Sequence, residues 1–163
     1  SEEAQTTFDP NGTTDFAEML TMVKRDKIWA EPARVTARAF AEKGSPAYVY
    51  LFSYVSPSMR ERMRFGAAHG SEIPYVFNNL RGRNGAALEP KDQEVAKMMN
   101  TYWVNFAKTG DPNDQHLPKW PRYNPTKDEL LEIQRDGTAV GKPDPKKARL
   151  DVIEKAVEIM KPR

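Results

Sequence analysis

Apolar residues recur at helical spacing in several stretches of this chain. The polar opening segment, Ser1 to Thr13, predicts a loop. Asp15 can then cap a helix, because Glu18 follows at the spacing of a capping box. The apolar stripe of this helix occupies positions i, i+3, i+4 and i+7, at Phe16, Met19, Leu20 and Val23. A second helix is bracketed by Pro32 at its start and Gly44 after its end.

The pattern changes at residues 47–54, where almost every position is apolar, β-branched or aromatic. Such a run predicts a strand that is buried on both faces. A basic, methionine-containing loop with one helical turn is expected after Pro57. Residues 129–134 predict a second, shorter strand that ends at an Asp-Gly turn.

Two further helices complete the pattern. Pro90 and Gly110 bracket the longest, and Asp144 with Pro145 opens the last. The sequence therefore predicts a mostly helical α/β fold with about two strands. Because a two-stranded sheet is marginal by itself, the chain resembles the last third of a larger α/β protein.

The composition of the chain excludes some classes of function. The chain has 163 residues and a net charge of +2 with both signs interspersed, which is not the charge pattern of a nucleic-acid-binding protein. It has no apolar run of about 20 residues, so no membrane span is predicted. Cysteine is absent, which excludes disulfides and thiolate chemistry. That composition fits the cytoplasm or a bacterial periplasmic or secreted location, and leaves the compartment open.

One of only two histidines, His69, lies in the segment RFGAAHGSEIPYVF. Gly66 and Gly70 flank it, and Glu72 follows three positions later. The imidazole either does chemistry or is a polar side chain in a turn. The loop follows a predicted buried strand, and active sites gather at that edge of α/β sheets. A metal site is not expected, because zinc takes at least three protein ligands and this spacing offers two.

Four segments, in this order, resemble type-B carboxylesterases, the family of bacterial para-nitrobenzyl esterases and cholinesterases. They are PAYVYLFSYVSP, GAAHGSEIPYVF, YWVNFAKTGDPN and LPKWPRYNP, at residues 46–57, 66–77, 102–113 and 117–125. The resemblance is nearer to the bacterial esterases, because the disulfide cysteines of cholinesterases are missing. It implies an α/β-hydrolase that cleaves carboxylic esters with a Ser–Glu/Asp–His triad and no cofactor.

The resemblance also implies roles for individual residues. His69 matches the triad histidine, which takes a proton from the serine and returns it to the leaving alcohol. Glu72 matches a buried glutamate that supports the active site; the alternative is a helix-start carboxylate bound by backbone N–H groups. A possible pocket lip comprises Met59, Met63 and Phe65. A structural ion pair is expected between Asp26 and an arginine near the C-terminus, with Arg149 as the candidate.

The rest of the triad is not in this sequence. None of the six serines lies in a G-x-S-x-G elbow, no HGGG-type oxyanion motif occurs, and the family's triad acid lies upstream. We therefore expect residues 1–163 to be the C-terminal part of one α/β-hydrolase domain, inactive alone. Its expected partners are a small-molecule carboxylic ester, and either the remainder of the parent esterase or further copies of itself. The alternative is a non-catalytic relative used for binding or adhesion.

Overall fold

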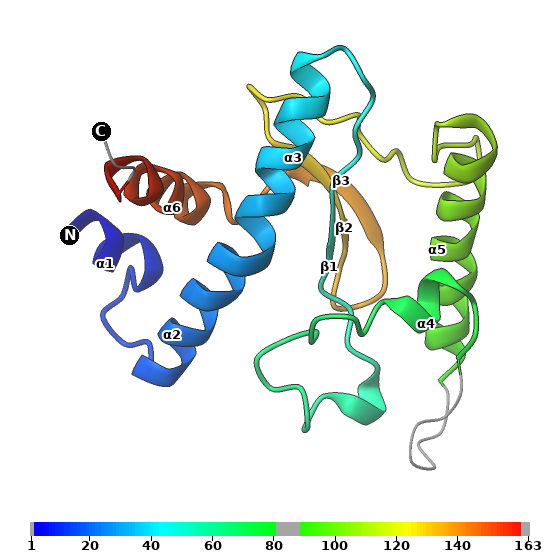
Figure 1. The fold of residues 1–163 in the computed structure, drawn as a ribbon. Coiled ribbons are helices and arrows are strands. Elements are labelled where there is room, and N and C mark those ends of the chain that lie inside the picture. The colour runs from blue at the N-terminus through cyan, green and yellow to red at the C-terminus, as the bar shows by residue number, and fades with distance from the viewer. Residues whose placement is uncertain (1, 81–88, 161–163) are drawn as a thin grey trace. The chain divides into compact units, whose positions relative to one another are not determined.

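The computed structural model describes residues 2–80 and 89–160 (Figure 1). The chain divides into two compact units. The first unit comprises Ser1–Val49, Tyr123–Glu129 and Pro143–Arg163, and the second comprises Tyr50–Arg122 and Leu130–Lys142. The first unit is helical, whereas the second holds most of the sheet and the His69 segment.

Two helices of the first unit, α2 and α3, begin where the sequence predicts. Asp15 caps α2 (Phe16–Arg25), since its carboxylate accepts hydrogen bonds from the backbone N–H groups of Ala17 and Glu18. Pro32 lies in the first turn of α3 (Glu31–Glu42), as predicted. A π-helical turn, Asp26–Ala30, joins α2 to α3 without a break. The final helix, α6, spans Lys147–Met160, and the Asp144 carboxylate accepts a hydrogen bond from the Lys146 N–H just before it.

The opening segment, Ser1 to Thr13, was expected to be a loop; this is confirmed for residues 9–13 but wrong for Glu2–Phe8. Residues Glu2–Phe8 form a helix, α1, with two glutamates in its first turn. Phe8 is buried against Leu150 and Ile153 of α6. A helix this short is marginal without tertiary packing, and its seven residues carry no recognisable stripe. Contact with α6 therefore stabilises a helix that local sequence does not indicate.

Beside this small apolar core the first unit buries several charged side chains. The predicted ion pair is confirmed: Arg149 Nε lies 2.7 Å from Oδ2 of Asp26, whose side chain is fully buried. Arg34, with 3% of its side chain exposed, binds Glu31 at 2.9 Å, Asp151 at 2.6 Å and Glu154 at 3.1 Å. Arg34 thereby links α3 to α6 through the acidic face of α6.

Asp151 makes part of this linkage dependent on pH. Burial raises the pKa of Asp151, but hydrogen bonds from Lys147 and Arg34 outweigh it and lower the pKa below the ordinary 3.8. Because the pKa of Asp151 is lower in the folded protein, its carboxylate stabilises the fold at pH values above the ordinary pKa of 3.8. This stabilisation is lost as the pH falls through the lower pKa of the folded protein. Asp151→Asn in the full-length protein should therefore lower the melting temperature at pH 7. The difference from wild type should vanish at low pH; a constant difference would contradict this reading.

The second unit contains most of a three-stranded mixed sheet in the order β1-β2-β3. Strand β1 (Tyr50–Phe52) runs parallel to β2 (Glu129–Ile133), with Tyr50 opposite Leu131 and Phe52 opposite Ile133. The tight turn at Gly137 (φ 86°) connects β2 to β3 (Ala139–Pro143). This sheet differs from the predicted pair of strands, 47–54 and 129–134.

The sheet departs from the prediction in two ways, each with a physical reason. Strand β3 was missed because its sequence, AVGKP, contains glycine and proline, which are depleted in strands. Strand β1 is shorter than 47–54, and its residues are half-buried rather than fully buried. In the described sheet β1 has a neighbouring strand on one side only, which leaves its other edge without a partner among these strands.

Helix α5 (Pro90–Thr109) confirms the longest predicted helix, and Gly110 ends it with a φ of 77°. Its buried face includes Val95, Met99 and Tyr102, and the short α4 (Ile73–Val76) packs beside it (Figure 1). The predicted single turn in the basic loop is a 3-10 turn, Pro57–Met59. Among the described residues, no helix is both long and apolar enough to cross a membrane.

Candidate active site

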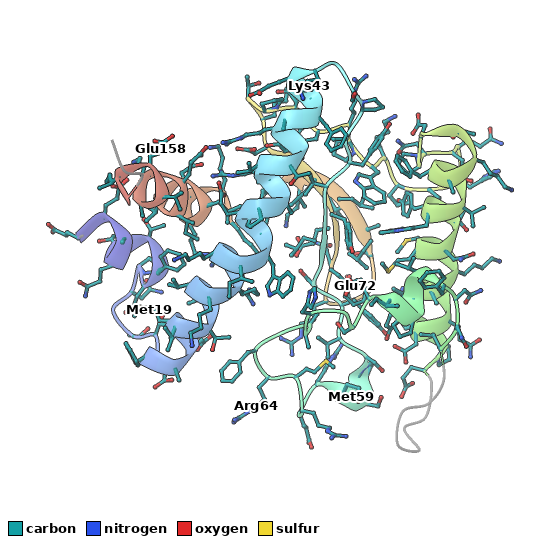
Figure 2. The ribbon with its side chains drawn as sticks, in the orientation of Figure 1. Met19, Lys43, Met59, Arg64, Glu72 and Glu158 are labelled. Atoms are coloured by element: carbon teal, nitrogen blue, oxygen red, sulfur yellow. The ribbon has the colours of Figure 1, made fainter. Side chains whose placement is uncertain are left out.

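The chain reaches the His69 segment from the carboxyl end of β1. Tyr54, Val55 and Ser56 continue from the strand and are buried, and the loop that follows is mostly exposed. Within it Met59 and Met63 are half-buried, whereas 54% of Phe65 is exposed. The three residues predicted to form a pocket lip therefore lie on one loop, although with different exposure. Figure 2 shows Met59 on the turn of this loop and Arg64 on the same loop, further along.

His69 lies in an exposed turn just before α4. Gly66 and Gly70 adopt φ values of 95° and 78°, a region that residues with a Cβ rarely enter. The backbone N–H of Ser71 donates to the Ala68 carbonyl at 3.1 Å, which closes the turn around His69. The glycines thus bend the backbone so that the imidazole is presented at the surface of this unit.

Glu72 stands at the junction between that turn and α4 (Figure 2). It is half-buried, and its Oε1 accepts a hydrogen bond of 3.5 Å from the hydroxyl of Tyr50 in β1. Burial, together with the negative charge of Glu72, raises the pKa of Tyr50 to about 12. In α4 as described, the Glu72 side chain caps no backbone N–H. Glu72 is thus bound by a side chain of β1, and its role in supporting the active site stays a prediction.

Asp92 is a buried carboxylate of this region that the sequence analysis did not single out. It accepts hydrogen bonds from the hydroxyls of Tyr54 at 2.8 Å, Tyr75 at 3.1 Å and Ser56 at 2.9 Å. The signal available in the sequence was the segment EPKD, in which Glu89 and Asp92 form a capping box at the start of α5. That pattern indicates a helix start; only the fold brings the three hydroxyls to it.

The other histidine lies elsewhere in the second unit. His116 is exposed in the proline-rich segment, where its Nε2 lies 3.2 Å from Nε2 of Gln115. Its backbone N–H donates to the Asp114 carboxylate at 2.7 Å. Over residues 2–80 and 89–160, no three His, Asp or Glu side chains gather closely enough to hold a metal ion.

Taken together, the described site offers an imidazole and a nearby carboxylate on one turn. A neutral imidazole can accept a proton from a hydroxyl group. The hydroxyl nucleophile and the oxyanion-binding groups of an ester hydrolase are not supplied by any recognisable motif in these 163 residues.

Comparison with known proteins shows which family the chain resembles. Residues 3–152 match the Carboxylesterase family. Over 111 residues the chain is 37% identical to mouse carboxylesterase 1E, a match covering 66% of this chain and 19% of that protein. Over 128 residues it is 36% identical to human neuroligin-3, covering 66% of this chain and 15% of that protein.

The fold agrees with the sequence match. A crystal structure of a Geobacillus stearothermophilus carboxylesterase superimposes with a TM-score of 0.75 and 27% identity, over 94% of this chain and 31% of that chain. The chain thus spans less than a third of the length of these relatives. Three observations agree: the family match across residues 3–152, the mostly helical α/β-hydrolase fold, and the GAAHGSEIPYVF segment. This chain therefore belongs to the carboxylesterase family.

Proposed function

We propose that these residues are the C-terminal part of an ester hydrolase, in which His69 acts as the general base of a Ser–Glu/Asp–His triad. The observation that carries the proposal is the position of His69. It is exposed in a glycine-flanked turn that follows the carboxyl end of a parallel strand, within a chain of the carboxylesterase family. An imidazole presented in this way can meet a serine from an upstream segment.

The chemistry follows from the properties of the imidazole. Neutral His69 removes the proton from a serine hydroxyl as its oxygen attacks the ester carbonyl carbon, and gives that proton to the leaving alcohol. A water molecule then attacks the acyl-enzyme in the same way, which releases the carboxylic acid and restores the serine. Glu72 supports the turn through Tyr50, and Met59, Met63 and Phe65 border the acyl or alcohol pocket. Small-molecule carboxylic esters are the proposed substrates.

This function is tested by comparing the full-length protein with the isolated chain. We expect the full-length protein to hydrolyse p-nitrophenyl acetate, and residues 1–163 alone to show no turnover above buffer. The physical reason is that an imidazole without a nucleophile and an oxyanion hole provides little stabilisation of the transition state. Equal activity of the two proteins would contradict the proposal, because it would locate the activity outside a triad.

A second candidate function is binding without catalysis. The observation that favours it is that neuroligin-3 is similar to this chain at 36% identity, close to the 37% of carboxylesterase 1E, and is not named as an esterase. The two candidates differ in the sequence upstream. A G-x-S-x-G elbow and an upstream acidic residue support the hydrolase, whereas their absence supports the binding protein.

A further inference from the structure

Asp92 brings four hydrogen-bond donors together around one buried carboxylate. The residue is 1% exposed. The hydroxyls of Tyr54 and Tyr75 donate to the same oxygen, Oδ1, at 2.8 and 3.1 Å. Ser56 Oγ and the backbone N–H of Glu89 donate to Oδ2 at 2.9 and 3.0 Å. A buried carboxylate with this many donors is strongly held, because each lost donor leaves part of a charge unsolvated.

The donors come from three different segments of the second unit. Tyr54 and Ser56 continue from β1, Tyr75 lies in α4, and Glu89 immediately precedes α5. Asp92 itself occupies the third position of α5, where the helix dipole favours a negative charge. One side chain therefore joins the end of β1, α4 and the start of α5.

Of these three segments, α4 is the one that carries the His69 turn. It begins directly after Glu72, and the N–H groups of Tyr75 and Val76 donate to the Glu72 carbonyl at 2.9 and 3.0 Å. A helix of four residues has little stability of its own, so its position is set by side-chain contacts. Those contacts include Tyr75 to Asp92, Tyr50 to Glu72, and Asn100 Nδ2 to the Val76 carbonyl at 2.8 Å.

We infer that Asp92 is a positioning residue for His69: through the Tyr75 hydroxyl, its carboxylate fixes α4, and with it the turn that holds the imidazole, against β1 and α5. The expected effect on catalysis rests on the proposed function, because the position of the imidazole affects the rate of ester hydrolysis only if the imidazole transfers a proton. A displacement of a catalytic group by about 1 Å can lower the rate about a hundredfold. The Tyr75 contact, three residues beyond Glu72, can thus affect catalysis without touching substrate.

The test uses two matched variants of the full-length protein, Tyr75→Phe and Tyr54→Phe. Each removes one hydroxyl donor from the same Asp92 oxygen and leaves the ring in place, so both are expected to fold. Only Tyr75 lies in α4; Tyr54 lies on the strand side and serves as the control. The two readouts are hydrogen exchange of the peptide spanning residues 66–77 and the kinetics of p-nitrophenyl acetate hydrolysis.

We expect Tyr75→Phe to speed exchange in this peptide by about tenfold, because α4 opens more often. We also expect it to lower kcat by about tenfold with little change in KM. Tyr54→Phe should change both readouts much less. Equal exchange in the two variants would overturn the inference whatever the activity. A wild-type protein without ester hydrolysis would overturn the proposed function instead, and the exchange comparison would still decide whether Asp92 positions the turn.

Discussion

His69→Ala in the full-length protein is expected to lower kcat/KM for p-nitrophenyl acetate by roughly 10⁴- to 10⁶-fold. Without the imidazole, a serine hydroxyl keeps its proton at neutral pH and is a poor nucleophile. Because His69 is exposed in a turn, its removal creates no buried cavity. The melting temperature should therefore stay close to that of wild type, which separates loss of chemistry from loss of fold.

The matched control is the second histidine of the chain. His116→Ala also removes an exposed imidazole from a loop of the second unit, but from the proline-rich segment. Its activity should remain within about twofold of wild type, as for most surface substitutions. If His116→Ala and His69→Ala reduced kcat/KM equally, or if His69→Ala left it unchanged, His69 would not be the general base.

Arg34→Ala is expected to lower the free energy of unfolding of the full-length protein by about 3–5 kcal/mol. Arg34 is buried and binds Glu31, Asp151 and Glu154. Its removal leaves the carboxylate of Glu31, 8% exposed, without its partner at 2.9 Å. Breaking a buried ion pair from one side costs more than the pair contributes, since the remaining charge is poorly solvated. Urea-induced unfolding followed by circular dichroism measures the loss.

Arg38 provides the comparison for that prediction. It lies one turn along α3, binds Glu154 at 2.6 Å, and keeps 21% of its side chain exposed. Arg38→Ala should cost less, about 1–2 kcal/mol, because water can reach Glu154, its nearest partner, which is 34% exposed. Its second partner, the buried Asp128 at 3.6 Å, keeps an ion pair with Lys147 at 3.4 Å. Equal losses for the two variants would show that burial of Arg34 does not determine the strength of this linkage.

Where the sequence carried a complete local signal, its prediction of structure was confirmed. A proline at the start, a glycine after the end and an apolar stripe between them defined α5, and Asp15 with its capping spacing defined the start of α2. The pairing of Asp26 with Arg149 was also confirmed, although it came from the family resemblance rather than from local pattern. Local patterns succeed when the forces that form an element act between neighbouring residues.

The elements that escaped prediction depend on contacts distant in sequence. Helix α1 forms against α6, more than 100 residues away, and β3 enters the sheet through its hairpin despite Gly141 and Pro143. Asp92 shows the same limit for the site. Its capping role could be predicted from the sequence, but its hydrogen bonds with Tyr54 and Tyr75 join residues 38 and 17 positions apart. No periodicity in a single sequence records such pairings.

The central claim, that the His69 imidazole transfers a proton for a serine nucleophile outside these residues, is tested most directly by one distance. In a crystal structure of the full-length protein, we predict that a ring nitrogen of His69 lies about 2.6–3.2 Å from the Oγ of a serine in a G-x-S-x-G segment. A His69 ring with no serine hydroxyl within reach, even through one water molecule, would contradict the account.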